Sequence, residues 1–125
     1  MILVDTSVLV DSLTGAKRSA PAFRAAIASG ERLMLSSIVL YEWVRGSRLS
    51  EELAAQEALL PGGSALPFGP EEALLSAKLY LSVKRARGRE LDLAIAATAI
   101  LKDAALWTLN TAAFADLPGL QLWTP

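Results

Sequence analysis

The chain has 125 residues, enough for one ordinary domain with a substantial core, and we expect residues 1–125 to form a single domain. It contains neither cysteine nor histidine, which excludes disulfides, thiolate nucleophiles, catalytic triads built on imidazole, and metal sites with those ligands. The net charge of −1 gives the molecule as a whole no strong attraction for nucleic acid, so such binding would need a local basic patch.

The first half of the chain alternates short apolar runs with segments of helical pattern. Serine and threonine caps open several expected helices, and glycine follows several of their ends. The expected strands are Ile2–Val4 and Arg32–Leu35, and the expected helices are Val8–Leu13 after a cap at Thr6 or Ser7, Pro21–Ser29, a segment from Ser36 or Ser37 to about Arg45, and Ser50–Leu60.

The second half repeats this alternation after a turn at Pro61–Ser64. Acidic residues open its first helix and basic residues close it, which complements the helix dipole. Strands that alternate with helices predict an α/β fold with a parallel sheet covered on both faces. The expected helices are Pro70–Arg87 and Leu91–Lys102, and the expected strands are Ala65–Phe68, Ala105–Thr108 and Leu120–Trp123.

Four polar residues follow expected strands or lie in apolar helical segments. Asp5 ends the first strand and Asn110 follows Ala105–Thr108, so both belong at the carboxyl edge of the sheet, where α/β proteins bind ligands. Glu42 and Asp92 are lone carboxylates in apolar helices. Taken singly, each residue has an ordinary structural explanation. Asp5 or Asp92 can cap a helix, Glu42 can lie on a solvated face, and Asn110 can be a loop residue.

As a group, the carboxylates indicate a cation site. Each neighbouring carboxylate raises the free-energy cost of ionising the others, so a cluster of acids normally persists with a bound cation. Oxygen ligands without histidine or cysteine favour Mg²⁺ or Mn²⁺. The sequence therefore predicts Mg²⁺ or Mn²⁺ as the cofactor.

Four stretches together resemble the PIN-domain ribonucleases, specifically the small VapC-type toxins of bacterial toxin–antitoxin pairs. They are MILVDTSVLVD at the N-terminus, LSSIVLYEWVRG around Glu42, RGRELDLAIAATAI around Asp92, and TLNTAAFADLPGLQL near the C-terminus. The resemblance covers essentially the whole chain and implies a three-layer α/β/α sandwich with a parallel sheet of four or five strands. It also implies an endoribonuclease dependent on Mg²⁺ or Mn²⁺, with Asp5, Glu42 and Asp92 as its three constant acids and no histidine base.

The fourth site position departs from the family pattern. Relatives place an acid where Asn110 stands or three residues later, where this chain has Ala113. Asp116 resembles part of the loop before Pro118 more than a substitute for that acid. The resemblance thus implies three acidic metal ligands, with Asn110 offering a neutral oxygen, and it leaves open whether the full rate and a second metal position are retained.

Hydroxyls and a local basic patch are the expected contacts to an RNA substrate. Thr6 or Ser7, together with Asn110, would orient a water molecule or the scissile phosphate. Helix-dipole complementation and a solvated face explain the cluster of cations before Asp92 as well as an RNA-binding role does. The cluster consists of Lys84, Arg85, Arg87 and Arg89.

The composition also predicts a partner surface. Hydrophobic residues make up 53% of the chain and the mean hydropathy is +0.39, both high for a small water-soluble domain. The resemblance implies a homodimer and a cognate antitoxin as partners. The start lacks a basic signal region, and no run approaches the ~18 apolar residues that a membrane span needs, so we expect a cytoplasmic protein without membrane contact.

Two other functions stay open at this point. One is another Mg²⁺-dependent phosphohydrolase, such as a haloacid-dehalogenase-like phosphatase, whose nucleophile also follows the first strand. That class uses Asp-x-Asp, and here the second position is Ser7. The other is a catalytically weakened PIN domain that acts as an interaction module, for which Asn110 and Ala113 are the evidence.

Overall fold

A sheet of four short parallel strands forms the centre of the computed structural model, which describes all residues 1–125. Its order is β2-β1-β3-β4, so the chain leaves β1 toward β2 on one side and reaches β3 on the other. The crevice at the carboxyl ends of β1 and β3 is therefore the topological switch point, where such sheets bind ligands. The strands are β1 (Ile2–Val4), β2 (Leu33–Met34), β3 (Ala105–Trp107) and β4 (Gln121–Leu122).

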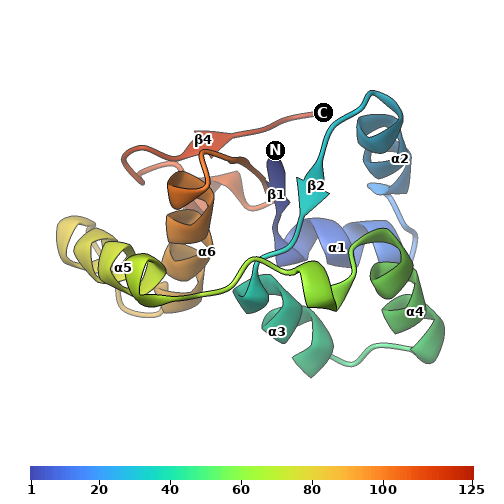
Figure 1. Cartoon of the computed structure of the whole chain (residues 1–125), viewed down its shortest axis with the longest axis horizontal. Coiled ribbons are helices and arrows are strands. Elements are labelled where there is room, and N and C mark those ends of the chain that lie inside the picture. The colour runs from blue at the N-terminus through green and yellow to red at the C-terminus, as the bar shows by residue number, and fades with distance from the viewer.

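Helices cover the sheet on both sides, which confirms the expected α/β/α sandwich with four strands (Figure 1). α5 (Pro70–Ser82) packs against α6 (Glu90–Leu101), and both lie apart from the group formed by α1, α2 and α4 (Figure 1). α3 packs against both α1 and α6. No helix has the length and apolar character needed to cross a bilayer. The remaining helices are α1 (Thr6–Leu13), α2 (Ala20–Ala28), α3 (Ser37–Arg45) and α4 (Ser50–Leu59).

The core surrounds β1, β3 and α6. Every residue of β1 is buried, and so is each residue of α6 from Leu93 to Ala99, as the nearly unbroken apolar run predicted. Trp107 of β3 packs against Phe23 at 5.9 Å and against Trp123 at 4.9 Å between ring centroids. Each fully buried Leu or Ile side chain contributes about 1.5–3 kcal/mol, so this core holds the carboxyl ends of β1 and β3 rigidly side by side.

The strand expected at Ala65–Phe68 is absent from the sheet, and this prediction was wrong. Within it only Leu66 pairs with another segment, in an isolated parallel bridge to Ser36. Pro67 follows directly and has no N–H with which to extend the pairing.

The helix expected at Pro70–Arg87 ends at Ser82, so its predicted end was also wrong. The Ser82 hydroxyl donates to the Leu79 carbonyl (3.0 Å), and Val83 adopts an extended backbone. The basic residues after it therefore lie in a turn between α5 and α6. They do not complement the α5 dipole from its last turn.

Candidate active site

Asp5 lies at the carboxyl end of β1 with 6% of its surface exposed. Its N–H donates to the Trp107 carbonyl of β3 (2.9 Å). Its Oδ2 atom accepts hydrogen bonds from the hydroxyls of Ser7 (2.8 Å) and Thr108 (2.7 Å). Asp5 occupies the N-cap position of α1, yet its side chain makes no capping bond. The carboxylate is instead held through Oδ2, and no hydrogen bond within the chain reaches Oδ1.

The two hydroxyls that hold Asp5 are themselves anchored by backbone N–H groups. Leu109 donates its N–H to Ser7 Oγ (3.0 Å), and Asn110 donates its N–H to Thr108 Oγ1 (3.0 Å). Sequence reasoning missed Thr108, which is 5% exposed. Its role depends on β3 lying beside β1, which the residues of neither strand reveal, so no signal in the sequence alone would have found it.

Glu42 comes to the same edge from α3, which begins at the predicted serine cap. Ser36 Oγ accepts from the Val39 N–H (3.1 Å). Glu42 Oε1 accepts from the Thr6 hydroxyl (2.8 Å), while Oε2 lies 3.9 Å from Arg45 Nη2. The Glu42 side chain is only 18% exposed, which does not fit a solvated helix face.

Asp92 lies in the first turn of α6 and is partly buried. Burial raises the pKa of Asp92 above its ordinary value, and the charges of Asp5 and Glu42 raise it further, while Arg89 opposes the shift. Asp5 and Glu42 therefore both lie within electrostatic reach of Asp92. As the side chains stand, no three acidic groups converge closely enough to hold a metal ion, so cation binding would draw them together.

Asn110 and Ala113, the two positions where relatives place a fourth acid, lie in the segment that follows β3. Asn110 is exposed and precedes a short 3₁₀ turn at Thr111–Ala113. Its backbone is fixed by Thr108, whereas its side chain makes no hydrogen bond within the chain. Asp116 points to Arg89 and not to the acids, and its pKa is lowered mainly by the hydrogen bonds from that guanidinium.

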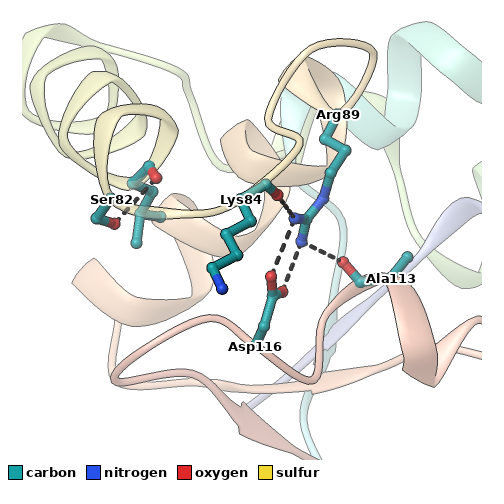
Figure 2. Close-up of polar contacts among 6 residues, drawn as sticks. Ser82, Lys84, Arg89, Ala113 and Asp116 are labelled. Carbon is teal, nitrogen blue, oxygen red and sulfur yellow. Dashed lines mark hydrogen bonds and ion pairs between the residues drawn. The ribbon is translucent and has the colours of Figure 1, made fainter.

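Of the basic residues before Asp92, Arg85 and Arg87 are exposed in the turn between α5 and α6. Arg89 is different, since its guanidinium donates hydrogen bonds to Asp116 and to the carbonyls of Lys84 and Ala113 (Figure 2). The accessible members of the expected RNA-binding patch are thus Lys84, Arg85 and Arg87.

A family model described as the PIN domain matches residues 2–120. The chain belongs to the PIN-domain family. This membership sets aside the haloacid-dehalogenase-like alternative. Among curated proteins, this PIN domain is similar to Ribonuclease VapC19 of Mycobacterium tuberculosis, with 36% identity over 124 residues that cover 97% of this chain and 98% of that protein.

Solved structures show the same PIN-domain fold. VapBC2 from Rickettsia felis, bound to a DNA fragment from its promoter, matches with a TM-score of 0.74 and 24% identity, over 99% of this chain and 100% of that chain. A toxin–antitoxin complex from Klebsiella pneumoniae matches with a TM-score of 0.70 and 27% identity, over 96% and 95% of the two chains.

Proposed function

We propose that this PIN domain is an endoribonuclease that hydrolyses RNA phosphodiester bonds with a bound Mg²⁺ or Mn²⁺, as the toxin of a toxin–antitoxin pair. The observation that carries the proposal is Asp5, a buried carboxylate held through one oxygen at the β1–β3 crevice, with Asp92 in electrostatic reach of both Asp5 and Glu42. The similarity to Ribonuclease VapC19 along almost the whole chain supports RNA as the substrate.

The donor set fits a hard divalent cation. It contains only oxygen atoms. The pKa of Asp92 is raised first by burial and then by the charges of Asp5 and Glu42, and a cation would relieve that repulsion. Asp5 and Asp92 would bind the cation directly, and Glu42 directly or through water. A cation held by these residues would supply an activated water and would neutralise charge that builds on the phosphate.

The chain's own hydroxyls orient these acids. Ser7 and Thr108 both donate to Asp5 Oδ2, which leaves Oδ1 without a hydrogen bond within the chain. Thr6 fixes one oxygen of Glu42 in the same way. Ordering the acids before the substrate arrives reduces the reorganisation that the reaction requires. Direct contact of Thr6 or Ser7 with water or phosphate stays a prediction, as does the role of Asn110.

Exposed apolar residues support the expected partners. Leu74 is 73% and Leu81 is 85% exposed on α5, and together they offer apolar surface that a homodimer could cover. The solved relative from Klebsiella pneumoniae is a toxin–antitoxin complex, which supports a cognate antitoxin for this chain. We place this activity in the cytoplasm.

A fluorogenic RNA assay tests the proposed function. We expect cleavage with Mg²⁺ or Mn²⁺, loss of cleavage in EDTA, and recovery when excess cation is returned. Cleavage that persists in EDTA would contradict the metal site. A folded protein that cleaves no RNA with either cation would support the alternative, a weakened PIN domain that serves as an interaction module.

The missing fourth acid gives a second prediction. Asn110→Asp is nearly isosteric, so it adds charge with little change in packing. We expect tighter Mn²⁺ binding and RNA cleavage up to about tenfold faster, which corresponds to about 1.4 kcal/mol. Ala113→Asp should do less, because Arg89 already holds the backbone at that residue.

Titration calorimetry with Mn²⁺ and the RNA assay measure both variants. Thr111→Asp is the control, because it adds the same charge to the same loop at an exposed position. If Asn110→Asp binds Mn²⁺ no better than Thr111→Asp, then Asn110 does not face the acids.

A further inference from the structure

The guanidinium of Arg89 connects three segments of the chain (Figure 2). Its Nη1 donates to the Lys84 carbonyl (3.1 Å) and to Asp116 Oδ2 (3.0 Å). Its Nη2 donates to the Ala113 carbonyl (3.0 Å) and to Asp116 Oδ1 (2.6 Å). The two bonds to Asp116 form a bidentate pair, the strongest geometry between a guanidinium and a carboxylate. Asp116 is the only acidic side chain that forms a salt bridge with Arg89.

Arg89 also lies next to the acidic site. It is the N-cap residue of α6, and Asp92 follows three residues later. Residues with this spacing are neighbours on a helix surface, so a long Arg89 side chain can reach Asp92. The structure contains no salt bridge between them, although the charge of Arg89 does act on Asp92.

We propose that Asp116 is a positioning residue, which holds the Arg89 guanidinium on the loop side and away from Asp92, so that Asp92 stays available to a cation. The inference rests on the proposed function, because the cation site is the one argued there. Without Asp116, Arg89 keeps two carbonyl partners but no anionic one. Asp92 is then the acid within its reach, and a guanidinium bound to Asp92 would compete directly with the metal.

If the Arg89–Asp116 pair served only to stabilise the fold, removal of the Asp116 charge would lower stability and leave the cation affinity of the folded protein unchanged. Asp116 is 50% exposed, and such pairs contribute little to stability. The loop that contains Asp116 is held independently by the buried side chains of Phe114 and Leu117 and by the bond from the Asn110 N–H to Thr108. Removal of the Asp116 charge should therefore change cation affinity far more than it changes folding.

The experiment measures Mn²⁺ affinity by titration calorimetry in Asp116→Asn, Arg89→Gln and the double variant. Asp116→Asn should bind Mn²⁺ roughly tenfold more weakly, the effect of a charge brought within ~4–6 Å of a carboxylate. Arg89→Gln should bind at least as tightly as the wild type. The double variant should match Arg89→Gln, because the loss in Asp116→Asn acts through Arg89. Asp103→Asn is the control, since Asp103 is exposed and has no salt bridge.

Wild-type affinity in Asp116→Asn, or a double variant as weak as Asp116→Asn, would overturn the inference. A wild-type protein that binds no Mn²⁺ would instead count against the proposed cation site. A crystal structure of Asp116→Asn then judges the inference alone. Arg89 bonded to Asp92 supports it, and Arg89 still on the Lys84 and Ala113 carbonyls contradicts it.

Discussion

Asp5→Asn will slow RNA cleavage by about 100-fold or more, which corresponds to about 2.7 kcal/mol, and will leave the fold intact. The reason lies in the two hydroxyls that donate to Asp5 Oδ2. They require an acceptor, so the asparagine will turn its carbonyl oxygen toward Ser7 and Thr108. Its NH₂ group will then face the crevice, and an amide nitrogen with two hydrogens cannot bind a cation.

Cleavage of fluorogenic RNA in Mg²⁺, together with a circular dichroism melt, measures this result. Asp11→Asn is the matched control, because Asp11 lies in the same helix and its carboxylate accepts a bond from Ser19. It should cleave RNA like the wild type. Full activity in Asp5→Asn would show that the proposed site is wrong, whereas loss of folding in that variant would show up in the melt.

Asp92→Asn should also lose cleavage, and in the absence of metal it should be more stable than the wild type near neutral pH. The pKa of Asp92 is raised in the folded protein by burial and by Asp5 and Glu42. A raised carboxyl pKa means that the folded state favours the protonated form. The stability that this carboxyl contributes is therefore fully present below 3.8, its pKa in the unfolded chain. That contribution is lost as the pH rises through the higher pKa of the folded protein. Asparagine is neutral at every pH and avoids this decline.

Thermal melts in EDTA from pH 4 to neutrality measure the effect. The melting temperature of the wild type should fall relative to that of Asp92→Asn as the pH rises. Added Mg²⁺ should then stabilise the wild type and leave the variant unchanged, because a ligand stabilises only the state that binds it. A variant that is less stable than the wild type at every pH would contradict the electrostatic account of Asp92.

Elements whose stability comes from burial were predictable from the sequence alone. β1 is apolar throughout and α6 is nearly so from Leu93 to Ala99, and both of these segments are buried. The ends of elements were less predictable because they depend on partners distant in sequence. α5 ends before its basic residues, and the turn that follows is held by Arg89, which finds Asp116 across 27 residues of chain.

The candidate site divides in the same way. Asp5, Glu42 and Asp92 could be singled out as candidates, because an ionised carboxylate among apolar residues costs free energy unless a partner compensates it. Thr108 could not be predicted, because its role depends on β3 lying beside β1. The residues of a strand do not reveal which strand will be its neighbour. Asp116 was expected to belong to the loop before Pro118, and its contact with Arg89 could not be predicted because the two residues are 27 positions apart.

The hydrogen bond from Thr108 to Asp5 joins residues 103 positions apart. During synthesis Asp5 is therefore made long before the β3 strand and the Thr108 hydroxyl that follows it. Contacts this distant in sequence also form late in folding, because a long loop must close first. Until β3 has joined the sheet, the Asp5 carboxylate lacks one of the two hydroxyls that hold its Oδ2 atom, so the proposed active site is organised only late in folding.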